Sequence, residues 1–191
     1  FIPCRYQFGE VFFMEYRTTL MQEKNIYSAM KRISYEIIEQ NGGCDNLVLL
    51  GIRRRGVPLA NIIAANIKLI EGEDVPVGEL DITFYRDDLE PIEIDPVVHK
   101  SYVDFDITGK NVILVDDVLY TGRTIRAAMD AVMDLGRPRT IKAAVLIDRG
   151  HRELPIKANY VGKNVPTAER EFISVQLTEF DGCNKVDLYI K

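Results

Sequence analysis

The sequence predicts an α/β fold, a doubly wound and mostly parallel β-sheet flanked by helices. Short apolar runs typical of buried strands alternate with longer segments whose apolar residues recur at helical spacing. The clearest strand is Val112–Val115, and the clearest helix, Ile125–Leu135, follows it and is ended by Gly136 and Pro138. Polar segments come directly after several predicted strands. In such a sheet, ligands bind beyond the carboxyl ends of the strands, so these segments are expected to share one site.

The first half of the chain contains two predicted helices separated by a strand. Gln22–Gln40 carries its isoleucines and Met30 on one helical stripe, and Asn41-Gly42-Gly43 ends it. Leu47–Leu50 is a short buried strand. The second helix is predicted at about Val57–Leu69, with a proline in its first turn, as helix starts favour.

The second half is predicted to add a long loop and the remaining strands. Val77–Tyr85 is expected to be extended, and Arg86–Thr108 to be a surface excursion because it has many charges and little period. The remaining predicted elements are the strand Ala143–Ile147, the loop Arg149–Asn164 and the closing strands Phe172–Leu177 and Lys185–Ile190. There are no internal repeats.

The N-terminal segment Phe1–Phe13 is aromatic-rich, has no clear period and contains no methionine. It lacks the basic region before an apolar core that marks a signal peptide. We interpret it as a translated leader or a cloning remnant, with Met14 a possible native start. Residues 14–191 are then expected to form a single domain, a length that is sufficient for one full hydrophobic core.

The composition narrows the class of function. Hydrophobic residues make up 47% and charged residues 28% of the chain, as in soluble globular proteins. No apolar stretch approaches the roughly 20 residues that cross a bilayer. Three scattered cysteines form neither a disulfide framework nor a metal spacing, which favours a reducing cytoplasm. With a net charge of −5, any RNA site must be a local basic patch.

Two adjacent carboxylates, Asp116 and Asp117, follow the predicted strand, and Thr121–Thr124 leads into the helix. A helix N-terminus offers unpaired N–H groups and a partial positive charge, so the glycine-containing turn suits a phosphate. The carboxylates would repel that phosphate and suit hydroxyl groups or a metal instead. A ribose 5-phosphate satisfies both demands. The alternative that these residues leave open is an ordinary connection with a solvated acid pair.

Val112–Thr124 resembles the phosphoribosyl pyrophosphate (PRPP) motif of type I phosphoribosyltransferases: an apolar run, two acids, an apolar pair and a Thr-Gly phosphate loop. Its form Asp-Asp-Val-Leu-Tyr-Thr-Gly-Arg-Thr, together with Asp81–Leu89 and Asp148–Ile156, resembles the PyrR family. This family comprises bacterial pyrimidine-operon attenuation regulators that are also uracil phosphoribosyltransferases. The resemblance covers roughly Lys24 to the C-terminus and implies the type I phosphoribosyltransferase fold with a small hood.

The resemblance implies that the chain converts uracil and PRPP to UMP and pyrophosphate. Catalytic roles fall on Asp116, Asp117 and Arg86, and Arg86 would belong to a mobile loop that closes over PRPP. The implied cofactor is Mg²⁺, held through substrate and water with no direct protein ligand assigned. The implied substrate-binding residues are Arg54, Arg55, Arg86, Asp116, Asp117, Val118, Leu119, Tyr120, Thr121, Gly122, Arg123, Thr124, Arg149 and Ile173.

The pyrophosphate loop is expected at Gly51–Gly56, where three arginines lie between two glycines. Glycine lets the backbone approach an anion, and arginine binds phosphate bidentately. Relatives usually have threonine where Arg54 stands, so one hydroxyl contact would be missing. A solvated basic loop is the alternative. By resemblance, Arg149 belongs to the hood over the uracil, and Ile173 would contribute a backbone contact there.

The resemblance also implies an RNA site, since the family binds pyrimidine-operon mRNA with UMP or UTP as co-ligand. Arg152, Lys157 and Lys163 match the family's RNA-contacting positions, and Lys31 and Tyr35 are helix candidates that match less well. Lys31 and Tyr35 stand where relatives carry threonine and histidine, so RNA affinity or sequence preference would differ. Basic patches of this kind recognise RNA loops by binding their phosphates and contacting their exposed bases. A solvated polar face is the alternative interpretation.

Two other functions stay open at this point. One is a purine (hypoxanthine or guanine) phosphoribosyltransferase, which shares the PRPP motif, and the other is an RNA-binding regulator with vestigial catalysis. Because relatives assemble, a homodimer or higher homo-oligomer is expected, without membrane association. His99 and His151 lack the partners that a catalytic triad or a zinc site needs and are interpreted as exposed polar residues.

Overall fold

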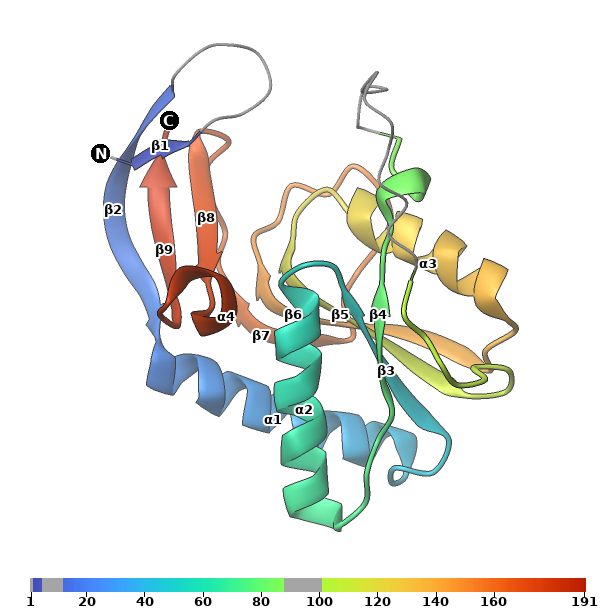
Figure 1. Ribbon diagram of the computed structural model, residues 1–191. Coiled ribbons are helices and arrows are strands. Elements are labelled where there is room, and N and C mark those ends of the chain that lie inside the picture. The colour runs from blue at the N-terminus through green and yellow to red at the C-terminus, as the bar shows by residue number, and fades with distance from the viewer. Residues whose placement is uncertain (1, 5–11, 88–100) are drawn as a thin grey trace.

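The computed structural model describes residues 2–4, 12–87 and 101–191, and it contains two sheets (Figure 1). The larger sheet has five parallel strands in the order β4-β3-β5-β6-β7. These strands are β3 Leu47–Ile52, β4 Val77–Leu80, β5 Asn111–Leu119, β6 Thr140–Asp148 and β7 Tyr160–Asn164. The predicted parallel sheet is therefore confirmed.

Helices cover both faces of this sheet, as a doubly wound fold requires (Figure 1). Helices α1 (Glu23–Asn41) and α2 (Gly56–Glu71) pack on one face and α3 (Arg123–Leu135) on the other. Alternate residues of β5 enter the two cores: Ile113 packs with α1 and α2, whereas Leu114 packs with α3. This alternation is the period of a strand that is buried on both sides.

The buried face of α3 is narrower than the spacing of its apolar residues predicts. Ile125, Ala128 and Val132 are buried, but Met129 and Leu135, which share the predicted stripe, are 41% and 42% exposed. Among the described residues, none of the helices has the length and apolar character of a membrane span.

The hood is a second, antiparallel sheet in the order β1-β2-β9-β8, which stands beside the carboxyl edge of the main sheet (Figure 1). Its strands are β1 Ile2–Cys4, β2 Phe12–Gln22, β8 Glu171–Gln176 and β9 Lys185–Ile190, and the short helix α4 (Thr178–Asp181) joins β8 to β9. Strand β2 runs directly into α1. Ile173, Val175 and Leu188 join the core of α1 and α2, so the hood is packed onto the domain.

Four predictions about local structure were wrong or incomplete. β5 continues through the two acids to Leu119 instead of ending before them, because β6 keeps pairing with it as far as Leu119. Its pairing with β3 stops at Val115. The expected loop after Arg149 contains β7, and the extended segment after Val77 closes with a single 3₁₀ turn, η1, at Thr83–Tyr85. β2 was not predicted at all.

The Arg86–Thr108 excursion is described at its two ends only, because residues 88–100 lie outside the described part of the chain. At its far end Tyr102 forms an antiparallel bridge with Glu79 of β4, with N–H···O distances of 2.9 and 3.0 Å. The excursion therefore returns along the edge of the main sheet. The prediction for His99 lies outside the described residues, and the interpretation of Phe1–Phe13 stays a prediction.

Candidate active site

The segments that follow β3, β4 and β5 meet at one cavity of about 390 Å³ at the carboxyl edge of the main sheet. Its lining residues are Ile52, Arg53, Arg54, Asp81, Ile82, Thr83, Arg86, Asp116, Asp117, Val118 and Thr124. A neighbouring hollow of about 270 Å³ is lined by Arg86, Val118–Thr124 and Glu153. The two hollows share Arg86, Val118 and Thr124, so they form a continuous candidate site.

The acid pair lies inside strand β5, near its carboxyl end, rather than on a loop. Asp116 is 8% exposed, and its Oδ1 accepts the N–H of Asp117 at 2.9 Å. Asp117 is half-buried, and its Oδ1 accepts the N–H of Val118 at 2.7 Å. Each carboxylate is thus held by the next backbone N–H, so the carboxylate positions are fixed by the strand itself.

Burial dominates the electrostatics of this pair. It raises the pKa of Asp116 well above the ordinary value, and the charge of Asp117 adds to the effect while Arg86 opposes it. Burial also raises the pKa of Asp117, against the hydrogen bond from Val118 and the positive charge of Arg55. Because the two carboxyl groups are neighbours, they titrate as one coupled pair. An added positive charge in the cavity would favour their ionised forms.

The turn before α3 has the geometry of an anion site. Gly122 is the N-cap of α3 with φ +96° and has no side chain to cap the helix, and Thr121 Oγ1 accepts the N–H of Arg123 at 3.3 Å. A Cβ on Gly122 would lie 3.3 Å from Ile156 Cβ, so both the backbone angle and the space favour glycine. The carbonyl of Thr121 accepts the N–H groups of Glu153 and Leu154 at 3.0 and 3.1 Å, which ties the turn to the loop after β6.

The side chains of the turn are divided between the ligand space and the protein. Thr124 lines the cavity. Arg123 donates to Glu153 at 2.8 Å and to Asp87 at 3.1 Å, and Asp87 also pairs with Arg126 at 3.3 Å. The start of the excursion after β4 is therefore anchored on α3, next to the predicted phosphate position.

The loop after β3 packs its backbone against β5. A Cβ on Gly56 would lie 2.1 Å from the carbonyl oxygen of Val115, so only glycine permits this approach. The Arg53–Arg54 peptide bond is cis. Arg54 is exposed and lines the cavity, as the prediction of a pyrophosphate contact requires.

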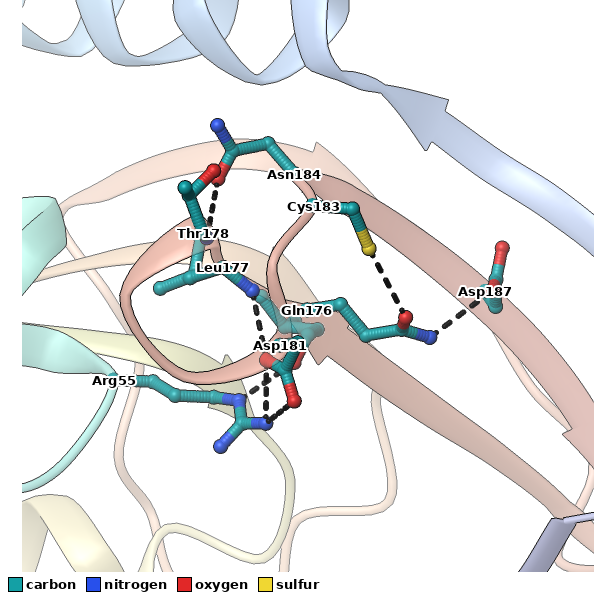
Figure 2. A network of polar contacts seen from close by, with 9 residues as sticks. Arg55, Gln176, Leu177, Thr178, Asp181, Cys183, Asn184 and Asp187 are labelled. Carbon is teal, nitrogen blue, oxygen red and sulfur yellow. Dashed lines mark hydrogen bonds and ion pairs between the residues drawn. The ribbon is translucent and has the colours of Figure 1, made fainter.

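Arg55 is directed differently from Arg54. Its Nε donates to the carbonyl of Val175 at 2.6 Å, and its Nη2 donates to both oxygens of Asp181 at 2.9 and 3.0 Å (Figure 2). It is not among the residues that line the cavity. The predicted contact between Arg55 and the leaving group stays a prediction, and in this structure the side chain binds the hood.

Sequence reasoning missed three polar residues of the cavity, Arg53, Asp81 and Thr83. Arg53 pairs with Glu79 at 2.7 Å and with Asp81 at 3.4 Å. Burial raises the pKa of Asp81, but hydrogen bonds from Thr83 and the charge of Arg53 together hold that pKa below its ordinary value. The available signal was position, since Asp81 lies inside the predicted extended segment Val77–Tyr85, directly after the strand β4 that ends at the same edge as β5.

Arg149 and Ile173 lie where the main sheet meets the hood. Arg149 is 6% exposed, donates to Thr167 Oγ1 at 3.1 Å and to the Glu171 carbonyl at 2.6 Å, and stacks 4.2 Å from the ring centre of Tyr120. Burial lowers the pKa of its guanidinium. Ile173 is buried in β8. Leu119 is buried, whereas Tyr120 remains 39% exposed beside the phosphate turn.

Residues 17–179 match the family model described as phosphoribosyl transferase domain. "Bifunctional protein PyrR" of Clostridioides difficile (strain 630) is 59% identical over 172 residues, which cover 90% of this chain and 97% of that protein. The protein of the same name from Pelotomaculum thermopropionicum is 61% identical over 170 residues, covering 89% and 94%. The chain belongs to the PyrR family of phosphoribosyltransferases.

Solved phosphoribosyltransferases share the fold at low identity. The hypoxanthine-guanine phosphoribosyltransferase (hpt-2) of Bacillus anthracis superposes with a TM-score of 0.68 at 22% identity, covering 91% of this chain and 98% of that one. The Trypanosoma cruzi hypoxanthine phosphoribosyltransferase gives a TM-score of 0.68 at 18% identity, covering 91% and 96%. These matches confirm the type I phosphoribosyltransferase fold of the PyrR-family chain.

The predicted RNA residues of this PyrR-family chain lie on elements that the fold brings together. Helix α1 packs beside β7, where Arg32 donates to the carbonyls of Val161 and Gly162 at 3.0 and 2.6 Å. Lys31 and Tyr35 are exposed on α1, and Lys163 is exposed on β7 with its Nζ donating to the Leu20 carbonyl at 2.9 Å. Lys157 is exposed in the connection that precedes β7.

Arg152 differs from these four residues because its guanidinium faces the protein. It pairs with Asp148, and it donates to the carbonyls of Tyr120 at 2.6 Å, Ile156 at 2.9 Å and Gly150 at 3.1 Å. These bonds hold the loop after β6 against the phosphate turn. The predicted RNA role of Arg152 stays a prediction, and its geometry favours a scaffolding role. His151 is exposed, as expected, and contacts the Thr167 carbonyl.

Proposed function

We propose that this protein is a uracil phosphoribosyltransferase that converts uracil and PRPP to UMP and pyrophosphate, and that it also regulates a pyrimidine operon by binding its mRNA. The observation that carries the enzymatic half is the union of an acid pair, a phosphate turn and a basic loop at one cavity. Relatives that are about 60% identical over nearly their whole length carry the name of a bifunctional protein.

The cavity suggests how PRPP would lie. Its 5-phosphate fits the turn at Gly122, where the α3 N-terminus offers N–H donors. The ribose 2′ and 3′ hydroxyls can then donate to Asp116 and Asp117, and the pyrophosphate is left to extend toward Arg54 and the loop after β3. Each end of the substrate meets a complementary charge.

In the proposed reaction the C1′–O bond breaks and pyrophosphate leaves with the electron pair, so the sugar passes through an oxocarbenium-like state. A ring nitrogen of uracil forms the new bond to C1′ and releases its proton. Asp116 and Asp117 hold the hydroxyls, and their negative charge stabilises the positive charge that develops on the sugar. Arg86, which lines both hollows, is placed to neutralise phosphate oxygens. Exclusion of water by the excursion after Arg86 would prevent hydrolysis of the activated sugar.

The residues of the cavity can bind the proposed Mg²⁺ cofactor through two carboxylates, with the other ligands supplied by water and substrate. Asp116 and Asp117 offer carboxylate oxygens in the cavity, and the described residues contain no group of three or more acidic, histidine or cysteine side chains that would form a protein cage. Mg²⁺ characteristically keeps several waters and takes substrate phosphate oxygens. We therefore propose that the acid pair holds it through water, where it would neutralise the leaving pyrophosphate.

We propose uracil rather than a purine as the base. The purine enzymes among the solved structures are only about 20% identical and share the fold alone, whereas the PyrR relatives are about 60% identical. The base would sit between Arg149 and the free edge of β8, where the backbone of Ile173 can donate to and accept from a pyrimidine. The intact acid pair and turn argue against vestigial catalysis.

The proposed RNA site is the face made by Lys31, Tyr35, Lys157 and Lys163. Lysine ammonium groups bind phosphates, and an exposed tyrosine can stack on an unpaired base. UMP or UTP is the proposed co-ligand that favours RNA binding. The proposed partner, a nascent mRNA, places the protein in the cytoplasm, and a homodimer or higher homo-oligomer is proposed from the family resemblance.

The direct test of the enzymatic half is formation of UMP from uracil and PRPP with Mg²⁺, with hypoxanthine and guanine offered as competing bases. We expect UMP and pyrophosphate in equal amounts and no inhibition by the purines. Formation of IMP or GMP in preference to UMP would overturn the choice of base, and the absence of any nucleotide would overturn the enzymatic assignment.

A further inference from the structure

Arg55 joins the pyrophosphate loop to the hood through a single side chain. It is the N-cap residue of α2, at the end of the loop that follows β3. From there its Nη2 donates to both carboxylate oxygens of Asp181 in α4, and its Nε donates to the Val175 carbonyl in β8 (Figure 2). The Arg55 and Asp181 side chains are only 29% and 25% exposed, so solvent screens this ion pair less than an open surface pair.

The carboxylate of Asp181 is itself held in place by the hood. Its Oδ2 accepts the backbone N–H of Leu177 at 2.9 Å, which fixes the start of α4 (Figure 2). The ring of Phe180, the preceding residue, lies with its centre 5.7 Å from the Arg55 guanidinium carbon. A carboxylate with a fixed acceptor geometry binds an arginine with little loss of side-chain entropy. The contact is therefore preformed on the hood side.

Arg55 and Arg149 hold opposite ends of the same strand edge. Arg149 donates to the carbonyl of Glu171, and Arg55 to that of Val175, while β9 pairs with the other edge of β8. Because backbone groups alternate between the two edges of a strand, the N–H and C=O of Ile173 face the same edge as these two carbonyls. Ile173 lies midway between the two arginines.

We propose that Asp181 is a positioning residue for the reaction: by binding Arg55 it fixes the free edge of β8, which carries Ile173, relative to the pyrophosphate loop. This inference rests on the proposed uracil phosphoribosyltransferase activity. The base contacts one side of this connection and the pyrophosphate the other. The ion pair therefore sets the distance between the nucleophilic nitrogen and C1′.

Loss of the pair should affect the two substrates unequally. The PRPP contacts at Asp116, Asp117 and the Gly122 turn belong to the main sheet and do not depend on the hood. The base contact depends on β8. A hood that is free to shift by a fraction of an ångström loses the approach geometry, which lowers kcat and raises the KM for uracil more than the KM for PRPP.

The kinetic test compares Asp181→Asn with Glu179→Gln. The asparagine keeps an acceptor for the Leu177 N–H but removes the charge that holds Arg55, whereas Glu179 is an exposed acid of the same short helix and controls for loss of charge. We expect Asp181→Asn to lower kcat/KM for uracil by about tenfold or more, with the KM for PRPP changed by less than about threefold. Glu179→Gln should match the unmodified protein.

Two results would overturn the positioning role. A lower KM for PRPP in Asp181→Asn would mean that Asp181 competes with substrate for Arg55, and unchanged kinetics would mean that the pair is only structural. A double-mutant cycle with Arg55→Gln adds a check. If the pair acts as a unit, the double variant should be no slower than Arg55→Gln alone, and additive losses would contradict the proposal.

Hydrogen exchange separates this inference from the proposed function. Amides of β8 and β9 should exchange faster in Asp181→Asn than in the unmodified protein or in Glu179→Gln, while amides of α3 keep their rates. Unchanged exchange in the hood would overturn the positioning role even if UMP forms. The absence of UMP formation by the unmodified protein would instead overturn the activity on which the role rests.

Discussion

At the scale of single residues, the account depends on two neighbouring carboxylates that the protein keeps partly out of water. Asp116 and Asp117 each accept the next backbone N–H of the strand, at 2.9 and 2.7 Å. Their pKa values are raised chiefly by burial. Such groups are costly to the folded state, and their retention at the bottom of a cavity is typical of a functional site.

We predict that Asp117→Asn lowers kcat by about tenfold or more, because a neutral amide cannot stabilise positive charge on the sugar. Asparagine has nearly the same shape and keeps an acceptor for the Val118 N–H, so the fold should persist. Steady-state kinetics and circular dichroism measure the two effects. A variant with near-normal turnover would remove the carboxylate from the mechanism.

We predict that Asp116→Asn stabilises the protein at neutral pH. Because the folded-state pKa of Asp116 lies above its ordinary value of 3.8, ionisation opposes folding, and stability is lost as pH rises through the raised pKa. Removing the group should raise the free energy of unfolding by on the order of 1 kcal/mol for each unit of the pKa shift. Urea unfolding at several pH values tests this, and the gain should vanish in acid. A loss of stability at neutral pH would contradict the burial argument.

The same shifts predict the acid side of the pH–rate profile. The free enzyme must carry ionised Asp116 and Asp117 to bind ribose hydroxyls and Mg²⁺, so kcat/KM for PRPP should fall as pH decreases through their raised pKa values. The pH at which kcat/KM falls should lie above the pKa range of an ordinary exposed aspartate. The shape of this acid side of the profile should change in Asp116→Asn. A profile that is flat down to the ordinary aspartate range would contradict it.

At the scale of elements, the site is produced by the end of β5 and the start of α3. The strand continues two residues past the acids, and the turn at Gly122 then starts the helix with φ +96°. This strand–turn–helix unit was predictable because its apolar run, its acids and its glycine lie in one continuous stretch. Its exact boundary was not, because the length of β5 is set by its neighbours, which lie far away in sequence.

We predict that Gly122→Ala impairs PRPP binding whereas Gly109→Ala does not. Both glycines have positive φ, +96° and +74°, so alanine strains each by roughly 1 kcal/mol. Of these two glycines, only Gly122 has side chains within 4 Å of its Cβ position, those of Ile156 and Leu154, and only Gly122 lies at the proposed phosphate position. Thermal unfolding should show similar losses for both variants, and PRPP titration should show weaker binding for Gly122→Ala alone. Equal affinities would contradict the phosphate assignment.

Two elements could not be predicted from local pattern. β2 carries mostly exposed residues between Met14 and Met21, and register shifts at Tyr16/Thr18 and Thr19/Met21 interrupt its alternation. β7 buries only Tyr160 fully and ends in exposed residues, as an edge strand can. The sequence also could not predict which partner each arginine of the loop after β3 contacts, because Arg53, Arg54 and Arg55 are identical in type and adjacent in sequence.

At the scale of the whole molecule, the proposed base and RNA sites lie on the hood and on the α1–β7 face, outside the main sheet's own cavity. The hood strands β2 and β9 come from opposite ends of the chain, and β2 leads into the helix that carries Lys31 and Tyr35 (Figure 1). The proposed base pocket and the proposed RNA face are therefore attached to the same helix–sheet unit. The proposed nucleotide site at β8 and the proposed RNA site at α1 are connected through the paired strands β9 and β2.

We predict that Lys157→Ala and Lys163→Ala each weaken binding to a pyrimidine-operon leader RNA, because each removes a phosphate contact and reduces the salt dependence by about one counterion. Lys68→Ala, an equal change of charge on an exposed residue of α2, serves as the control. Filter binding with and without UMP measures the effect. Equal affinities for all variants would exclude this face.

The most direct test of the central claim is isothermal titration of PRPP into the protein in the presence of Mg²⁺, repeated with Asp117→Asn. The claim is that a buried acid pair and an anion-binding turn hold the two ends of one phosphorylated sugar. It predicts saturable heat with one site for each chain below millimolar PRPP, and weaker binding in the variant. No heat at millimolar PRPP, or identical binding by both proteins, would contradict it.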